Sequence, residues 1–227
     1  INVSQAIYHS CNYYFYEVGR LMGIDTLNAY ASAFGLGQDT GLELGGRTGI
    51  LDGPEYRSDA GSYWVGGDIL QCSIGQGNNL FTPLQLANYV ATIVNGGTRY
   101  QPHLLKTVMD YTNTEVYEEN EPVVLNEVEI SESSLDAIKE GMKGVVTEDG
   151  TASSYFAGFP IQVGGKTGSA QMTNHSATGV FVSFAPYDNP EIAVCVVGEY
   201  ASSGGSLAPV AIAIYDEYFG LNLNAVE

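Results

Sequence analysis

The residues best suited to binding chemistry form one short run, Gly164-Gly165-Lys166-Thr167-Gly168-Ser169-Ala170-Gln171. If this run is an extended strand at the edge of a sheet, the Lys166 ammonium attracts a carboxylate and the Thr167 hydroxyl hydrogen-bonds it. Gly168 has no side chain, so a ligand can lie against the strand backbone. The chain has only 8 lysine and arginine residues, and one of them set among glycines and hydroxyls is a candidate anchor for an anionic ligand.

Two other interpretations of this run lead to different chemistry. A phosphate-binding loop, G-x-x-x-x-G-K-[ST], needs glycine at the position of Pro160 and a helix after the lysine. Pro160 and the β-prone pattern that continues after Lys166 exclude it. A glycine-rich bend in a strand, with Lys166 exposed and without a ligand, stays open on these residues alone.

A second short motif, Ser10-Cys11-Asn12, gives the pattern S-x-N, which by itself arises often by chance. Together with K-T-G on a downstream strand it resembles the penicillin-interacting serine enzymes, whose third motif is S-x-x-K. The surroundings of both motifs are similar to class B penicillin-binding proteins, in the same order along essentially the whole chain. The matching segments are Tyr8 to Phe15 with Gly19, Ser73 to Gly77, Thr82 to Ala87, Asn95 to Thr98 and Gly150 to Ala152.

This resemblance implies a role for each residue of the two motifs. Ser10 is expected to relay a proton, and Asn12 to hydrogen-bond the amide side chain of the substrate. Lys166 and Thr167 are expected to hold the carboxylate of a D-alanyl-D-alanine peptide, or of a β-lactam that imitates it. The Ser169 N–H is expected to form half of an oxyanion hole, which stabilises a tetrahedral intermediate. The implied catalytic residues are Ser10, Asn12 and Lys166, and the implied substrate-binding residues are Thr167, Gly168 and Ser169.

The S-x-x-K motif, which carries the nucleophilic serine of this family, is absent. The residues three positions before the lysines are His103, Asp136, Glu140 and Val163. Because the motif precedes S-x-N in the family, we expect residues 1–227 to be the C-terminal portion of a transpeptidase domain whose nucleophile lies upstream of Ile1. The implied parent is a peptidoglycan D,D-transpeptidase that acts on D-alanyl-D-alanine stem peptides through a serine acyl-enzyme and is inhibited by β-lactams. The chain alone is expected to be inactive.

Two alternative functions stay open. The parent could be a sensor or scaffold that binds β-lactams or wall peptides without turnover, or a serine β-lactamase. The block from Gly75 to Gly97 resembles transpeptidases more than β-lactamases. An S-x-x-K motif upstream of Ile1 would favour the enzyme over the binding domain.

The composition narrows the possible partners. An excess of 26 acidic over 8 basic residues gives a net charge of −18, which repels nucleic acids and anionic membranes. No apolar run approaches the roughly 20 residues of a membrane-spanning helix. We therefore expect membrane attachment only through a missing N-terminal anchor, with the parent at the extracytoplasmic face of a bacterial membrane. The expected partners are peptidoglycan stem peptides, β-lactams and other cell-wall synthesis proteins.

Metal and cofactor chemistry is not expected. The cysteines and histidines lack the C-x-x-C, H-x-x-x-H and H-E-x-x-H spacings of common metal sites. None of the roles implied for the two motifs requires a cofactor.

The order of the helices and strands that must position these motifs indicates an α+β fold. Three C-terminal strands between Phe159 and Glu199 are expected to form an antiparallel sheet packed with helices. They belong to a β-lactamase or transpeptidase-like fold that lacks its N-terminal segment, so the sheet is expected to expose an edge. The strands are predicted at 159–172, 178–186 and 191–199, with turns at 173–175 and 187–190, and a helix at 206–219 is expected to cover one face.

Apolar spacing and capping residues predict the elements before this sheet. In order, they are two helical pieces between Val3 and Met22 that meet near Ser10, a helix at 26–34, a long loop at 35–67, a helix from Pro83 to Asn95, a hairpin or small sheet at 98–125, and a helix capped by Ser133 that ends near Val146.

Overall fold

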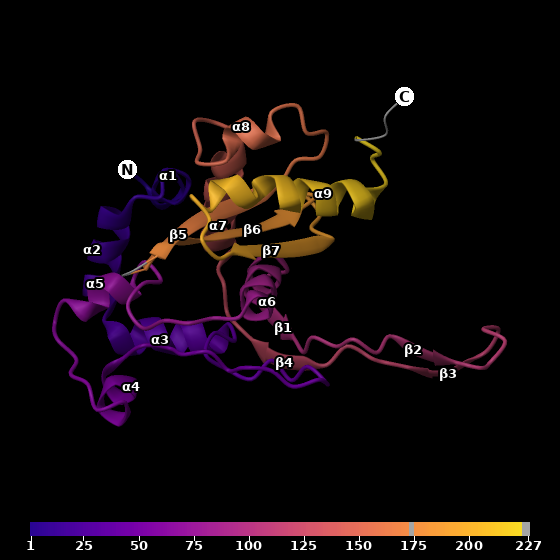
Figure 1. Ribbon diagram of the computed structural model, residues 1–227, viewed down its shortest axis with the longest axis horizontal. Helices are drawn as coiled ribbons and strands as arrows, with labels where there is room; N and C mark the ends of the chain where they lie inside the picture. Colours follow the sequence, from indigo (N-terminus) through magenta and orange to yellow (C-terminus); the bar gives the residue numbers. More distant parts are fainter. Residues whose placement is uncertain (173–174, 224–227) are drawn as a thin grey trace.

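A computed structural model describes residues 1–172 and 175–223 of the chain. Its centre is a three-stranded antiparallel sheet in the order β5-β6-β7, formed by β5 (Gly164–Met172), β6 (His175–Ala185) and β7 (Ile192–Gly198). Helix α9 (Ala208–Phe219) covers one face (Figure 1), and α6 (Pro83–Val94) and α7 (Glu132–Val146) pack on the other. The α+β class predicted from the sequence is confirmed.

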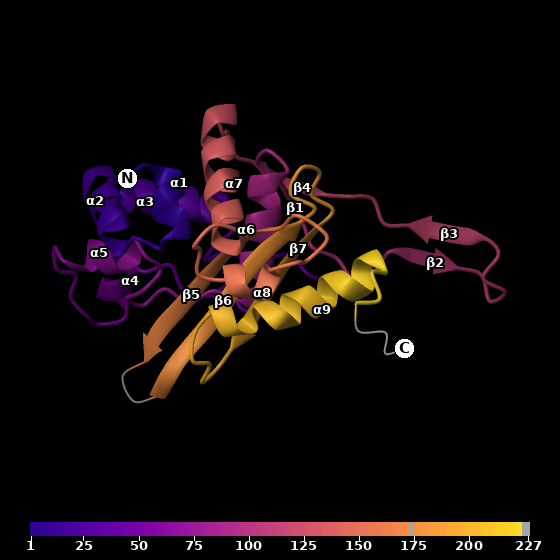
Figure 2. The same cartoon turned by 90° about the horizontal axis from the view of Figure 1, so that it is seen from above.

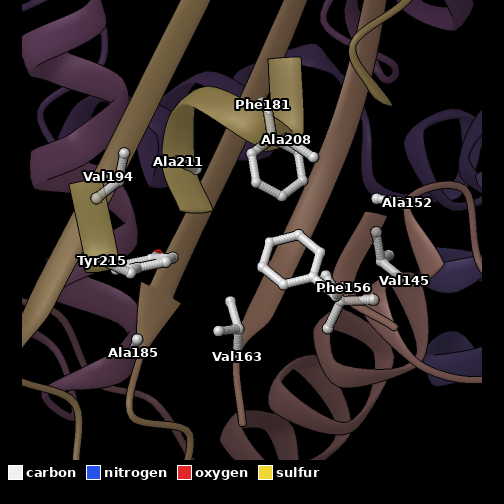
Figure 3. Packing of buried hydrophobic residues seen from close by; sticks show 11 residues of the cluster. Val145, Ala152, Phe156, Val163, Phe181, Ala185, Val194, Ala208, Ala211 and Tyr215 are labelled. Carbon is white, nitrogen blue, oxygen red and sulfur yellow. The ribbon is translucent and has the colours of Figure 1, made fainter. Parts of the chain in front are cut away.

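Alternation of side chains along β6 explains how the sheet binds helices on both faces. Phe181 belongs to a buried cluster with Ala211 and Tyr215 of α9 (Figure 3). Phe184, an odd number of residues further on, packs on the opposite face against Met142 of α7. Both faces of the sheet are thus apolar, and helices pack on each of them.

The first strand is shorter than predicted. It begins at Gly164 rather than Phe159, because the chain turns after α8 (Ser153–Phe156), where the Phe159 N–H donates to the Phe156 carbonyl at 3.0 Å. Pro160 has no N–H with which to enter a strand ladder.

The rest of the C-terminal region follows the predicted order. β6 begins at His175, earlier than the predicted 178, and the predicted turn residues Thr173 and Asn174 lie outside the described residues. A short 3-10 turn, η1 (Gly205–Leu207), leads into α9, so the predicted terminal helix is confirmed.

The N-terminal helices meet where predicted. α1 (Val3–Tyr8) and α2 (Asn12–Met22) are joined at Ser10, whose φ of 54° lies in the left-handed region. This backbone conformation is uncommon for a residue with a side chain and turns the chain sharply between the helices. The helix predicted at 26–34 is present as α3 (Ile24–Ala33), which begins two residues earlier and ends one residue earlier.

Two predictions about the middle of the chain are wrong in detail. The segment 35–67 contains a helix, α4 (Pro54–Asp59), and α5 (Asp68–Cys72) follows directly. Helices of 5 and 6 residues are too short to show a clear apolar period. Helix α7 is capped by Ser131, whose side chain accepts the Ser134 N–H, so Ser133 lies inside the first turn and cannot be the cap.

Residues 98–127 form a two-stranded ribbon, as predicted. β1 (Thr98–Tyr100) pairs with β4 (Val124–Glu127), and β2 (Thr107–Met109) pairs with β3 (Val116–Glu119). The β2–β3 end extends away from the rest of the molecule (Figure 2). Among residues 1–172 and 175–223, none of the helices has the length and hydrophobicity needed to cross a bilayer.

Candidate active site

A cavity of about 500 Å³ lies beside strand β5. Its walls come from the α1–α2 junction, the segment after α5, the loop before α8 and the loop before η1. All six residues singled out from the sequence line it: Ser10, Asn12, Lys166, Thr167, Gly168 and Ser169. Two motifs from distant parts of the chain are therefore neighbours in the fold.

Lys166 makes the central contact of this cavity. Its Nζ donates to Ser10 Oγ at 2.9 Å and to the Thr167 carbonyl oxygen. Burial lowers the pKa of Lys166 to about 8, because the ammonium loses its water shell inside the protein. In the described part of the chain no carboxylate lies within ion-pair distance of this ammonium. An anionic ligand can therefore act as its counter-ion.

Close helix packing places Ser10 beside Lys166. α1 lies against α7, where two glycines leave room for side chains of α1. A Cβ at Gly141 would lie 2.7 Å from the Ile7 side chain, and one at Gly144 would lie 2.8 Å from Tyr8. Because α7 also packs against β5, this contact fixes the end of α1, and with it Ser10, relative to the strand.

Thr151 is a site residue whose role the sequence did not reveal. Its Oγ1 lies 2.6 Å from Thr167 Oγ1, so the two hydroxyls orient each other. The loop that carries Thr151 is held close to α7, since a Cβ at Gly150 would lie 2.1 Å from the Gly144 carbonyl oxygen. The only signal in the sequence was the triplet Gly150 to Ala152, which carried family resemblance but no assigned role.

Two further loops close the sides of the cavity around Ser169. Gln76 Nε2 donates to the Ser169 carbonyl oxygen at 3.3 Å, and the Gly204 N–H donates to Ser169 Oγ at 3.2 Å. Gly204 is confined by its neighbours, because a Cβ there would lie 2.3 Å from the carbonyl oxygens of Gly168 and Val180. Only glycine fits at this position of the wall.

Asn12 occupies the remaining side of the cavity, at the first residue of α2, and is exposed. An exposed amide at this place can reach a ligand that lies along β5. Its role in binding the substrate's amide side chain stays a prediction, as does the role of the Ser169 N–H in an oxyanion hole.

The arrangement is suited to binding an extended chain that ends in a carboxylate. β5 pairs with β6, and no other strand of the described part of the chain pairs with its outer edge. This edge can therefore offer backbone groups to a ligand that binds as an added strand. The cavity at this edge is lined by Lys166 and Thr167, whose ammonium and hydroxyl can both bind a carboxylate.

Comparisons with known proteins agree with this geometry. A family model for the penicillin binding protein transpeptidase domain matches residues 1–216. The chain is 33% identical, over an alignment of 246 residues, to the peptidoglycan D,D-transpeptidase MrdA of Haemophilus influenzae, and covers 37% of that protein with 100% of its own length. The chain thus spans less than half the length of this relative.

Solved structures show the same similarity. Pseudomonas aeruginosa PBP2 in complex with WCK 5153 matches with a TM-score of 0.83 and 34% identity, over 96% of this chain and 49% of that chain. The PBP2 of a complex with MreC from Helicobacter pylori matches with a TM-score of 0.82 and 26% identity, over 98% and 41%. Penicillin-binding protein A from M. tuberculosis, as an imipenem acyl-enzyme complex, matches with a TM-score of 0.78 and 26% identity, over 92% and 45%.

The resemblance inferred from the S-x-N and K-T-G motifs is confirmed by the family model and by relatives at this level of identity. The chain belongs to the family of penicillin-binding protein transpeptidase domains.

Proposed function

We propose that this chain is the C-terminal portion of the transpeptidase domain of a peptidoglycan D,D-transpeptidase, and that it binds the D-alanyl-D-alanine end of a stem peptide. The observation that carries this proposal is Lys166, a partly buried ammonium for which the described residues hold no counter-ion, beside two hydroxyls at the outer edge of β5. A terminal carboxylate, or the carboxylate of a β-lactam, is the ligand group that satisfies it.

Each side chain has a role in this function. The carboxylate binds Lys166 and the Thr167 hydroxyl, which Thr151 orients from the loop before α8. Asn12 donates to the amide of the extended ligand. The Ser169 N–H stabilises the negative charge that forms on the carbonyl oxygen during acyl transfer.

Ser10 and Lys166 provide a path for a proton. Their side chains are 2.9 Å apart, so a proton can pass between Lys166 Nζ and Ser10 Oγ towards the leaving or attacking amine. With its pKa at about 8, Lys166 has both protonation states accessible near neutral pH, as proton transfer requires.

On this proposal, the chain does not contain the nucleophilic serine. It belongs to an S-x-x-K segment that precedes Ile1 in a longer protein, and the chain alone forms no acyl-enzyme. The longer protein acts on the extracytoplasmic face of a bacterial membrane and works with other cell-wall synthesis proteins. The support is that the relatives are peptidoglycan transpeptidases and that one structural neighbour is a PBP2 in complex with MreC.

Labelling with a fluorescent penicillin tests the proposal. We expect covalent, stoichiometric labelling of the longer protein, slow labelling of its Lys166→Ala variant, and no labelling of the 227-residue chain. Stoichiometric labelling of the chain itself would show that it contains a nucleophile and would overturn its assignment as a fragment.

Two further assays separate the alternatives. Rapid hydrolysis of a chromogenic cephalosporin by the longer protein would identify a β-lactamase. Labelling without cross-linking of stem peptides would identify a sensor or scaffold.

A further inference from the structure

Gln76 forms a bridge across the candidate active site. It lies in the segment after α5, on the wall opposite β5, and its Nε2 donates to the Ser169 carbonyl oxygen at 3.3 Å. None of the roles described above uses this side chain.

The carbonyl that Gln76 contacts lies on the free side of β5. Ser169 is opposite Gly179 of β6, and among the strands of residues 1–172 and 175–223 none pairs with the outer edge of β5. In an antiparallel ladder, the backbone groups of alternate residues point to opposite edges. A donor that reaches Ser169 from the opposite wall of the cavity marks its carbonyl as one that points outward.

A peptide-like ligand needs the same carbonyl. A ligand that adds to this edge as a strand pairs its backbone amides with the outward-pointing groups of β5. The Ser169 carbonyl is the acceptor for an N–H of such a ligand, at a distance of three residues along the strand from Lys166. The Gln76 amide and the ligand N–H therefore compete for one position.

Two hydrogen bonds hold the backbone of Gln76, whereas its side chain makes one exposed hydrogen bond. The Gln76 N–H donates to the Gln71 carbonyl at 3.0 Å, and Asn79 Nδ2 donates to the Gln76 carbonyl at 3.2 Å. The side-chain contact with Ser169 is long and exposed. The side chain can leave Ser169 without a change in the fold.

We propose that Gln76 is a displaceable cap on the Ser169 carbonyl, and that it determines which ligands enter the site. A ligand with an amide N–H replaces the hydrogen bond that Gln76 gives up, whereas a ligand without one leaves the cap in place. This inference rests on the proposed function, because it concerns ligands of the same cavity.

The test compares two β-lactams in the longer protein that contains the chain. Benzylpenicillin carries an acylamino N–H that can reach the Ser169 carbonyl, and imipenem carries a hydroxyethyl group instead. Because a neutral hydrogen bond contributes about 0.5–1.5 kcal/mol, Gln76→Ala should raise the second-order acylation rate of benzylpenicillin by about 2- to 10-fold. The rate for imipenem should stay unchanged.

Two variants serve as controls. Gln76→Glu keeps the size of the side chain but cannot donate to the carbonyl, and it should also raise the benzylpenicillin rate relative to imipenem. Gln71→Ala removes an exposed glutamine side chain of the preceding helix α5 that does not line the cavity, and it should change neither rate.

Each other outcome overturns the proposal. Equal loss of both rates in Gln76→Ala would show a structural role, and loss of the benzylpenicillin rate alone would show that Gln76 assists the ligand. Equal rates in all variants would show that the contact has no effect on entry. A failure of the proposed function would appear differently, as no acylation of the unmodified longer protein by either compound.

Discussion

Replacement of Lys166 by methionine should stabilise the chain at neutral pH. Methionine keeps most of the length of the side chain and removes its charge. Burial lowers the pKa of Lys166 from 10.5 to about 8, so the ammonium is less favourable in the folded chain than in the unfolded chain. In the described residues no carboxylate offsets this cost.

The size and the pH dependence of the effect follow from these two pKa values. At about 1.4 kcal/mol for each factor of ten in proton affinity, the lowered pKa corresponds to about 3 kcal/mol of lost stability. Loss of the hydrogen bonds to Ser10 and to the Thr167 carbonyl costs about 2 kcal/mol in the variant, at about 1 kcal/mol each. Lys166→Met should therefore be more stable than the unmodified chain by about 1 kcal/mol at pH 7.

The sign of this difference should change at high pH. Between about pH 8 and 10.5, the unfolded chain keeps a proton on Lys166 that the folded chain has lost. Stability rises with pH wherever the unfolded state binds more protons. The unmodified chain should gain stability relative to the variant through this window and be more stable by about 2 kcal/mol above it, where only the two lost hydrogen bonds count.

Urea denaturation, followed by circular dichroism at pH 7, 8, 9 and 10, measures this difference. Lys106→Met is the matched control, because Lys106 is exposed on the β1–β4 ribbon and surface substitutions change stability by about 0.5 kcal/mol or less. A constant difference between Lys166→Met and the unmodified chain across the four pH values would refute the argument. So would a variant that is less stable at pH 7.

Three other substitutions test a buried ion pair, a hydrogen bond in the core and the packing of the cavity wall. Asp52→Asn should destabilise the chain by about 3–5 kcal/mol, since it leaves the Arg57 guanidinium, bonded to Asp52 at 2.7 and 2.8 Å, without its buried partner. Tyr215→Phe should cost about 1–2 kcal/mol in the free energy of unfolding, because Ser183 Oγ loses its 2.7 Å hydrogen bond in the core. Gly204→Ala should weaken binding of a D-alanyl-D-alanine peptide by at least about 10-fold, measured by calorimetry, because its Cβ would lie 2.3 Å from backbone oxygens of the cavity wall.

Each of these predictions has a control or a contradicting result. Ser183→Ala combined with Tyr215→Phe should recover most of the lost stability in a double-mutant cycle. Gly46→Ala, at a glycine with open space around the Cβ position, should change nothing. An Asp52→Asn variant with unchanged stability would show that the pair is not needed to hold the 52–79 segment.

The fold predicted from the sequence was correct where local signals and tertiary packing agree. Helix α6 begins with a Thr82 cap and proline at its first position, and both appear in the structure. The helices α4 and α5 were missed because they are too short to show an apolar period, and because Asp52, which pairs with Arg57 of α4, is itself held by the Asn78 N–H, 26 residues further along the chain. Burial alone would raise the pKa of Asp52, but hydrogen bonds from Arg57 and the Asn78 N–H outweigh it and lower that pKa. No local pattern predicts such a pair.

The residues of the candidate site also divide into those that local motifs identify and those that only the fold brings to the cavity. Ser10 and Lys166 were found through short motifs whose residue types limit the chemistry. Thr151 and Gln76 reach the cavity only because loops close around β5, and a hydroxyl or an amide in a loop carries no signal of what it will face in the fold. Sequence can identify the groups that react with a ligand more readily than those that orient or cover them.

In the part of the chain that the structure describes, no carboxylate lies beside Lys166, although the sequence has 26 acidic residues. The carboxylates of Asp52 and Asp68 lie close to Arg57, and that of Glu17 to Arg20. A resident carboxylate at Lys166 would stabilise the folded chain, but it would also compete with an anionic ligand for the same ammonium. The unliganded fold therefore carries an unfavourable free energy at Lys166 that a ligand carboxylate can relieve on binding. Stability and affinity are linked through this one side chain, so a substitution that improves the first should weaken the second.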